Sequence, residues 1–171
     1  KKTAKIATVD DVTDRRLISD VNFYPPLTWL KELDWSGYKG QIKSGWEYYI
    51  MRPELEEYQE KSANIDHDFL VTCGGCYSEN LSKKLISLIR HHWPSSRIAV
   101  VLGPLAESTN SYFGEDIETF INPERYLDLI NRSTNIICTY GVTLFELAYL
   151  RKRTYFICLN KDHVKSSQMF L

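Results

Sequence analysis

Short apolar runs alternate with helical patterns along the second part of the chain. Runs of strand length and high apolar content occupy residues 67–73, 97–103, 117–121, 135–141 and 154–160. Between them, apolar residues recur every three or four positions, as in amphipathic helices, at 81–93, 122–130 and 142–150. This alternation predicts an α/β fold, a Rossmann-like parallel sheet with helices on both faces.

Individual residues predict where the helices begin and end, and which face of each helix is buried. The first helix, which Pro94 ends, is expected to bury Leu81, Leu85, Leu88 and Ile89. Asn122 and Pro123 are expected to begin the next helix, as its cap and its first-turn proline. Its inward face would carry Tyr126, Leu127 and Ile130. A last segment, 161–171, begins with a helical pattern.

The part before residue 63 is less regular, and the chain is expected to divide there into 1–62 and 63–171. Residues 5–11 predict a buried parallel strand that ends at Asp10 and Asp11. Paired acids at such a place can act as acid and base or hold a metal, and more often they cap the following turn. The acidic stretch 54–61 predicts a short exposed helix that connects the two parts.

Composition excludes several classes of protein. With 171 residues, 43% of them hydrophobic and 25% charged, the chain is that of a globular domain. The 21 basic residues nearly balance the 22 acidic ones, so nothing in the net charge favours nucleic-acid binding. No apolar run approaches the roughly 18 residues of a membrane span, and the first residues lack an apolar signal core. We therefore expect a cytoplasmic protein.

The cysteines allow one redox interpretation. Cys138 and Cys158 lie inside apolar runs and are expected to be small core residues. Cys73 and Cys76 form a C-x-x-C pair before a helix. A structural zinc site would need a second such pair or a suitably spaced histidine pair, and the sequence has neither. A thiol-disulfide oxidoreductase remains an alternative, because a helix N-terminus would lower the pKa of one of these thiols.

The same turn, and a second one, favour an anion site. Parallel sheets bind ligands at the carboxyl ends of their strands, where both turns are expected. Gly74 and Gly75 would let the backbone approach a ligand, while the following helix offers free N–H groups. Gly141 opens the second turn, and the Thr143 hydroxyl could bind a phosphate oxygen. Glu146 could accept hydrogen bonds from ribose hydroxyls, or it could be an acid that the helix dipole favours.

The succession of motifs resembles a known family. The segments are LVTCGGCYSENLSKKLISLI, IAVVLGP, LINRSTNIICTYGVTLFELAYL and FICLNKDH, preceded by TVDDVTDR and SGWEYYIMRPEL. They resemble the UDP-sugar hydrolases of pseudaminic acid biosynthesis, relatives of the two-domain GT-B glycosyltransferases such as the lipid II N-acetylglucosaminyltransferase. The resemblance covers nearly the whole chain. It implies that 63–171 is most of the C-terminal, nucleotide-sugar-binding half of a GT-B fold, and that 1–62 holds the last strand of an N-terminal domain with the connector.

The resemblance assigns each loop a part of the ligand. The first nucleotide-sugar loop would consist of Gly74, Gly75 and Cys76. The diphosphate would meet Gly141, Val142 and Thr143, and the uridine ribose would meet Glu146. The base would lie near Gly103 and Pro104, and the sugar near Asn160 and His163. UDP or a UDP-sugar is thus the expected partner and substrate, without a metal or other cofactor, because loop amides and helix dipoles can offset the diphosphate charge.

Departures from the family pattern limit what the resemblance implies. Cys76 and Val142 stand where the family has serines, and Tyr140 stands where it has a glycine. The family's G-x-G-H-x-x-R loop, which carries its catalytic histidine, is missing from this sequence. We therefore expect a fragment that binds UDP without turnover and needs an N-terminal domain in cis, with no catalytic residue of its own. An inactive scaffold domain is the other alternative, and the sequence does not indicate an oligomeric state.

Overall fold

The chain forms two compact units. A computed structural model describes residues 4–74, 79–104, 106 and 113–170. One unit, the sheet unit, spans Arg52–Leu159, and the other, the amino-terminal unit, combines Lys1–Met51 with Asn160–Leu171. The sheet unit thus begins at Arg52 and includes the connector helix expected from the sequence. Within the described ranges, no helix is both long and apolar enough to cross a membrane.

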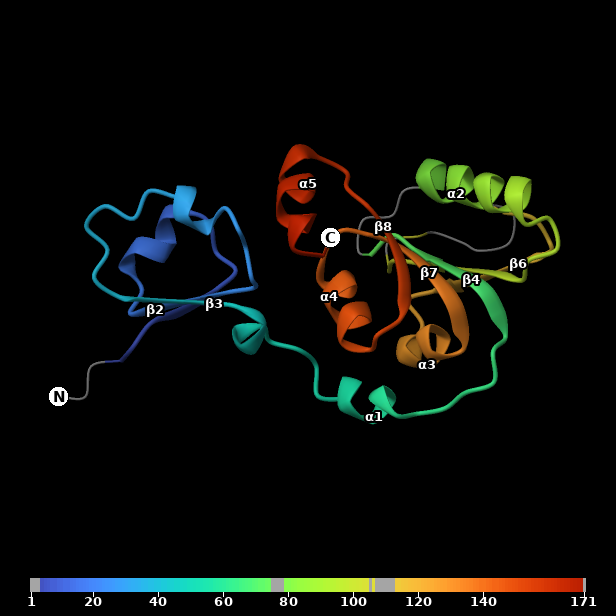
Figure 1. Cartoon of the computed structure of the whole chain (residues 1–171), viewed down its shortest axis with the longest axis horizontal. Coiled ribbons are helices and arrows are strands. Elements are labelled where there is room, and N and C mark those ends of the chain that lie inside the picture. Colours follow the sequence, from blue (N-terminus) through green and yellow to red (C-terminus); the bar gives the residue numbers. More distant parts are fainter. Residues whose placement is uncertain (1–3, 75–78, 105, 107–112, 171) are drawn as a thin grey trace. The chain divides into compact units, whose positions relative to one another are not determined.

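The sheet unit is built on one sheet of five strands in the order β6-β5-β4-β7-β8. These strands are β4 (His67–Thr72), β5 (Ile98–Leu102), β6 (Ile117–Ile121), β7 (Ser133–Thr139) and β8 (Arg153–Ile157). Every pairing among them is parallel. The main helices of the unit are α2 (Glu79–His92), α3 (Tyr126–Asn131) and α4 (Val142–Tyr149). The predicted α/β, Rossmann-like parallel sheet is confirmed (Figure 1).

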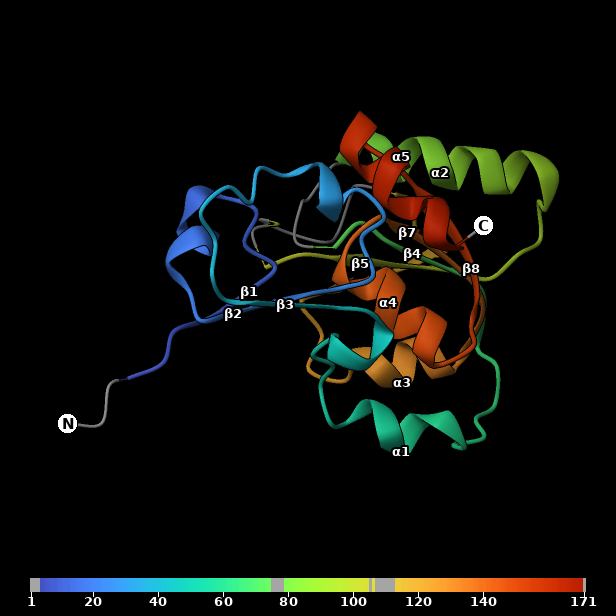
Figure 2. The ribbon, with the colours of Figure 1, turned by 60° about the vertical axis from the view of Figure 1, so that its left-hand side comes forward.

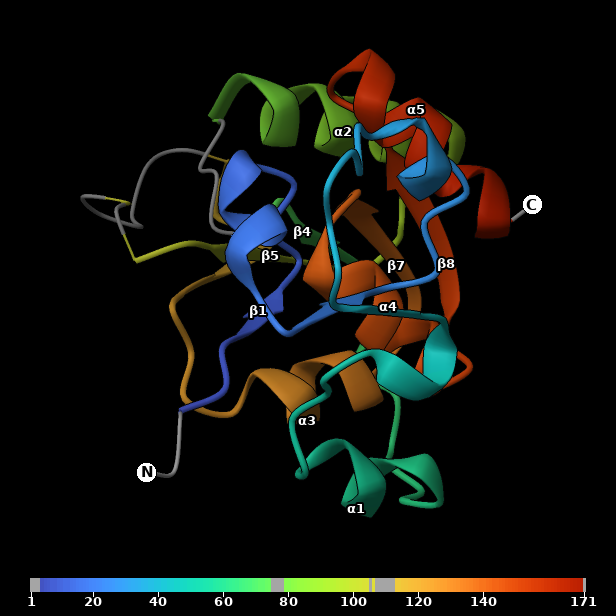
Figure 3. The ribbon, with the colours of Figure 1, turned by 90° about the vertical axis from the view of Figure 1, so that its left-hand side faces the viewer.

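Helices cover both faces of this sheet. Helix α2 lies on one face, and α3 and α4 lie on the other (Figure 1, Figure 2 and Figure 3). Strand β5 is buried at every position, which explains its unbroken apolar sequence. On the α2 side, the core contains Phe69, Val71, Ile86, Ile89, Ile98, Val100 and Leu102. Burial of each such side chain stabilises the fold by about 1.5–3 kcal/mol, so this layer fixes the sheet that positions the loops.

Two helix details differ from the sequence expectation. In α2, Ile89 is buried as expected and Leu81 and Leu85 are partly buried, but Leu88 is 56% exposed, and Ser82 and Ile86 complete the buried face. Helix α3 begins at Tyr126 with Arg125 as its N-cap, so Asn122 and Pro123 precede the helix, and Asn122 takes a left-handed conformation (φ 40°) instead of the extended one of an N-cap. The Asn122 N–H donates to the Leu102 carbonyl at 2.9 Å, which keeps this residue at the end of the sheet.

The amino-terminal unit contains a small parallel sheet of three strands in the order β1-β2-β3. These are β1 (Ala7–Val9), β2 (Val21–Tyr24) and β3 (Gln41–Ser44), and helix α5 (Lys161–Ser167) belongs to the same unit. Strand β1 is parallel, as expected, but not buried, and Val9 is 55% exposed. The physical reason is its position at a sheet edge, paired with β2 alone.

A short helix, α1 (Leu55–Gln59), is attached to the sheet unit by a buried leucine and a polar cluster. Leu55 is fully buried. The Tyr58 hydroxyl donates to Asp128 of α3 at 2.8 Å, and the Lys61 ammonium lies 3.2 Å from the same carboxylate oxygen. These two donors and Arg125 hold the pKa of Asp128 below its usual value, the Tyr58 hydrogen bond being the largest cause.

Replacing Asp128 with asparagine should lower the free energy of unfolding by about 1 kcal/mol at neutral pH, the usual size of a partly exposed charged hydrogen bond. A carboxyl group whose pKa is depressed by folding stabilises above its unfolded pKa, and this contribution disappears as pH falls through the folded pKa. Urea unfolding of Asp128→Asn and wild type should therefore differ at pH 7 and converge in acid. An equal difference at both pH values would contradict the role of this carboxylate.

Candidate functional site

The chain order of the strands reverses between β4 and β7, which are neighbours in the middle of the sheet. From β4 the chain continues to β5 and β6 on one side, and from β7 it continues to β8 on the other. The connections that leave β4 and β7 therefore diverge at one point of the carboxyl edge. Open α/β sheets bind ligands in the crevice that such a reversal creates.

A cavity of about 330 Å³ lies at this edge. Its walls come from the ends of β4, β5 and β6, from helices α3 and α4, and from the segment before α1. They consist of Arg52, Thr72, Gly74, Val101, Leu102, Gly103, Pro104, Asn122, Pro123, Glu124, Tyr126 and Thr143. Four residues predicted from the sequence thus line one cavity: Gly74, Gly103, Pro104 and Thr143. Gly75 and Cys76 were predicted for the same site and lie outside the described residues.

The beginning of α4 offers an open helix terminus beside this cavity. Gly141 is the N-cap in extended backbone conformation, and a Cβ atom built on it would meet nothing within 4 Å. Val142 is 63% exposed, and Thr143 lines the cavity. The first N–H groups of a helix have no partner within it and lie at the positive end of the helix dipole, and this end of α4 adjoins the cavity through Thr143. The bulky Tyr140 is not among the lining residues, and its ring packs edge-on against Phe145, with centroids 6.2 Å apart.

Glu146 does not itself line the cavity, but it contacts the lining residue Arg52. Only 3% of Glu146 is exposed, although it carries a carboxylate. Its Oε1 atom accepts a hydrogen bond from Nε of Arg52 at 2.7 Å, whereas its buried Oε2 atom has no hydrogen-bond partner. Burial raises the pKa of Glu146, and the charge of Arg52 opposes this effect. The pair thus leaves one buried carboxylate oxygen without a hydrogen bond, next to the cavity wall that Arg52 helps to form.

Tyr126 forms hydrogen bonds to the two elements that meet where the strand order reverses, the end of β4 and the start of α4. Its hydroxyl donates to Oγ1 of Thr72, at the end of β4, over 3.2 Å, and it also hydrogen-bonds to the side chain of Thr143 in α4. Burial raises the pKa of Tyr126 to about 12, so the phenol is neutral at physiological pH. A neutral hydroxyl can donate and accept hydrogen bonds without repelling an anion.

Cys73 does not have the features of a reactive thiol. It is 6% exposed, and its Sγ atom lies 3.6 Å from the Ser82 hydroxyl. Burial raises the pKa of Cys73, whereas the redox interpretation expected a lowered pKa at Cys73 or Cys76, and Cys76 lies outside the described residues. Cys138 is buried as expected, and burial raises its pKa to about 12, while Cys158 is only partly buried. These observations weigh against Cys73 as a reactive thiol.

The two glycines of the site should respond differently to alanine. Gly74 has a φ of 64°, a left-handed conformation that costs an L-residue about 1 kcal/mol or more. Gly141 is extended and has open space at its Cβ position. We expect Gly74→Ala to reduce the unfolding free energy by about 1 kcal/mol, and Gly141→Ala to change it by less than about 0.5 kcal/mol. Urea unfolding measures both variants, and equal losses of unfolding free energy for Gly74→Ala and Gly141→Ala would contradict this prediction.

Four other residues singled out in the sequence lie in the amino-terminal unit. Asn160 caps helix α5, because its side-chain oxygen accepts a hydrogen bond from the His163 N–H at 2.8 Å. Asp11 caps a turn, since it accepts hydrogen bonds from the N–H and the hydroxyl of Thr13 at 2.9 and 2.6 Å. Asp10, in a left-handed conformation, donates its N–H to the carbonyl of Phe23. These local hydrogen bonds account for Asn160 and Asp11 without a ligand.

Comparison with known proteins does not assign a family. No protein-family model matches this chain, and no curated protein matches it. The geometry of the carboxyl edge is therefore the basis for a functional proposal. The sequence analysis did not single out Arg52, which lines the cavity, because this residue stood out only as part of the MRPEL stretch. Its partner Glu146 is 94 positions away, so no local pattern could indicate the pair.

Proposed function

We propose that the sheet unit binds UDP or a UDP-sugar at its carboxyl edge. The unit would be the nucleotide-binding part of a UDP-sugar hydrolase or of a related GT-B glycosyltransferase. The reaction would transfer a glycosyl group from UDP to water or to an acceptor hydroxyl, in the cytoplasmic synthesis of a surface polysaccharide or of a nonulosonic acid such as pseudaminic acid. The proposal joins the motif resemblance to the geometry of the site.

The observation that carries the proposal is the convergence of two connections on one cavity at the reversal of strand order. Gly74 follows β4, Thr143 follows β7, and both residues line the cavity. A ligand that spans this crevice meets the backbone of one loop and the helix terminus of the other. This arrangement suits a nucleotide diphosphate, whose charge is spread over several oxygens between two bulky groups.

Each described residue has a proposed part in binding. The N–H groups at the start of α4 and the Thr143 hydroxyl would receive the diphosphate. The unpaired Oε2 atom of Glu146 would accept hydrogen bonds from the ribose hydroxyls, while the charge of Arg52 favours the ionised carboxylate against the effect of burial. Gly103 and Pro104, at the end of β5, would border the base. The chain's residues thus supply binding and orientation of the nucleotide rather than the proton transfer of the reaction.

Isothermal titration calorimetry of the whole chain with UDP tests the proposal. We expect UDP to bind roughly tenfold or more tightly than uridine, because uridine lacks the diphosphate that the helix terminus would bind. ADP serves as a control for unspecific diphosphate binding and should bind more weakly than UDP. Absence of any UDP binding would reject the proposal and favour the scaffold alternative.

A further inference from the structure

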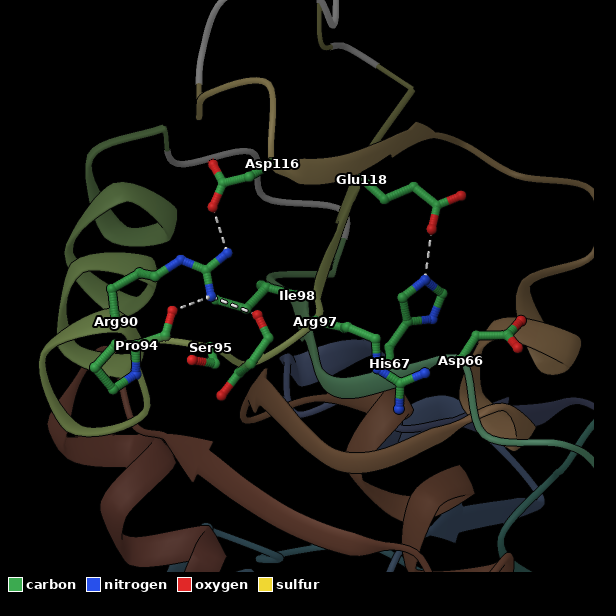
Figure 4. Close-up of a pocket in the computed structure, with 10 residues that line it drawn as sticks. Asp66, His67, Arg90, Pro94, Ser95, Arg97, Ile98, Asp116 and Glu118 are labelled. Carbon is green, nitrogen blue, oxygen red and sulfur yellow. Dashed lines mark hydrogen bonds and ion pairs between the residues drawn. The ribbon is translucent and has the colours of Figure 1, made fainter.

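A second cavity, of about 550 Å³, lies at the opposite edge of the same sheet, where strands β4, β5 and β6 begin (Figure 4). Its charged side chains are paired with one another, and the dashed lines in Figure 4 connect Arg90 with Asp116 and His67 with Glu118. Such pairs hold the ends of the strands together. The carboxyl-edge cavity differs, because its wall contains linked hydroxyl groups that can exchange the roles of donor and acceptor.

Three hydroxyl groups form a chain in the wall of the carboxyl-edge cavity. The Tyr126 hydroxyl donates to Oγ1 of Thr72 over 3.2 Å and also bonds to the side chain of Thr143. All three residues line the cavity. Thr72 ends β4, and Thr143 lies in the first turn of α4, the helix that follows β7. The two ends of the hydroxyl chain thus belong to the two elements that meet at the reversal of strand order.

The number of hydroxyl hydrogens fixes the direction of this chain. A hydroxyl group has one hydrogen to donate, whereas its oxygen can accept two hydrogen bonds. Because Tyr126 gives its hydrogen to Thr72, the bond between Tyr126 and Thr143 uses the hydrogen of Thr143. Thr143 therefore donates to Tyr126 and presents only the lone pairs of its oxygen to the cavity. These lone pairs repel the oxygen of a phosphate group.

The same groups can reverse their direction without losing a bond. When Thr143 turns its hydrogen toward the cavity, Tyr126 can donate to the Thr143 oxygen, and Thr72 can donate to the Tyr126 oxygen. Both hydrogen bonds of the chain are then kept, so the reversal leaves no buried hydroxyl unpaired. Burial raises the pKa of Tyr126 to about 12, so the phenol keeps the hydrogen that this exchange needs at physiological pH.

We propose that Tyr126 is a positioning residue for the diphosphate and acts through Thr143. When an anionic oxygen binds at the start of α4, the chain reverses, and Thr143 donates to the ligand while Tyr126 donates to Thr143. A hydroxyl group that accepts a hydrogen bond is a stronger donor, so the two hydroxyls behind Thr143 strengthen its bond to the anion. The proposal rests on the nucleotide site proposed above, to which it adds the residue that orients Thr143.

Two variants that break the same hydrogen bond test the reversal. Tyr126→Phe and Thr72→Val both remove the bond between these residues, but only Tyr126→Phe removes the group that donates to Thr143. In calorimetric titrations of the whole chain, Tyr126→Phe should weaken the binding of UDP and of inorganic diphosphate roughly fivefold, and uridine binding should change by less than about twofold. Thr72→Val removes the acceptor that competes with Thr143, so UDP should bind about two- to threefold more tightly. Equal weakening by both variants would indicate a merely structural role and would overturn the proposal.

A double variant shows whether Tyr126 acts through Thr143. Thr143→Val should weaken UDP binding roughly tenfold, and adding Tyr126→Phe should not increase this loss, because the hydroxyl that Tyr126 orients is already absent. Losses that multiply in the double variant would contradict the proposal. If Tyr126→Phe does not fold, the opposite effects expected for Thr72→Val and Thr143→Val decide the case.

The outcomes distinguish this proposal from the nucleotide site on which it rests. UDP that binds wild type and Tyr126→Phe with equal affinity would overturn only the role of Tyr126. UDP that does not bind wild type at all would reject the nucleotide site, and the role of Tyr126 with it.

Discussion

Replacing Glu146 with alanine is expected to weaken UDP binding by roughly thirtyfold. The Oε2 atom is buried and has no hydrogen-bond partner, so a ribose hydroxyl that reaches it would donate without displacing an existing bond. Hydrogen bonds to a charged group contribute about 1.5–3 kcal/mol each, and thirtyfold corresponds to about 2 kcal/mol. Calorimetric titration of the variant and of wild type measures this difference.

The ribose contact can be separated from general damage to the site by a ligand that lacks one hydroxyl. Wild type should prefer UDP to 2′-deoxy-UDP, and Glu146→Ala should lose this preference. Glu146→Gln keeps the shape of the side chain and one acceptor oxygen, so it should fall between wild type and the alanine variant. A preference for UDP that persists unchanged in Glu146→Ala would show that the carboxylate does not bind the ribose.

Replacing Arg52 with alanine is expected to lower the free energy of unfolding by about 2 kcal/mol. Removing one partner of a fully buried ion pair costs about 3–5 kcal/mol, because the remaining charge stays buried and unpaired. Glu146 is buried, but the side chain of Arg52 is 46% exposed, so solvent screening reduces the expected cost. Urea unfolding at neutral pH measures the loss.

The destabilisation by Arg52→Ala should depend on pH in a defined direction. Burial already raises the folded-state pKa of Glu146, and losing the Arg52 charge raises it further. A carboxyl group with a raised folded pKa stabilises below its unfolded pKa, and this contribution is lost as pH rises through the folded value. The variant's deficit should therefore be larger at pH 8 than at pH 4, and the Arg52→Ala/Glu146→Gln double variant should recover much of it. A deficit that is equal at both pH values would contradict this account.

The middle of the sheet could be predicted from the sequence because β4 and β5 are buried at nearly every position. Strand β5 shows this most clearly, since every one of its positions is buried and its sequence is a continuous apolar run. The start of α3 could not be predicted in the same way. Asn122 and Pro123 match the pattern of a cap and a first-turn proline, but Asn122 is left-handed and Arg125 is the N-cap, so the helix begins at Tyr126.

The candidate site was only partly predictable. Gly74 and Thr143 follow strands that the topology makes neighbours, so the rule for parallel sheets brings them together. Arg52 could not be found this way, because its contact with Glu146 joins segments 94 positions apart. The contact of His67 with Glu118 joins residues 51 positions apart, with no motif around either. Long-range pairs of charged residues leave no periodic signal in a sequence.

Mapping of amide resonances by NMR during a UDP titration tests the central claim most directly. The account predicts saturable changes at Gly74, Gly103 and Thr143, which line the carboxyl-edge cavity. Amides beside His67 and Arg97, at the other edge of the sheet, should remain unchanged. Changes confined to that other edge, or no changes at all at saturating UDP, would contradict the proposal that the reversal of strand order forms a nucleotide site.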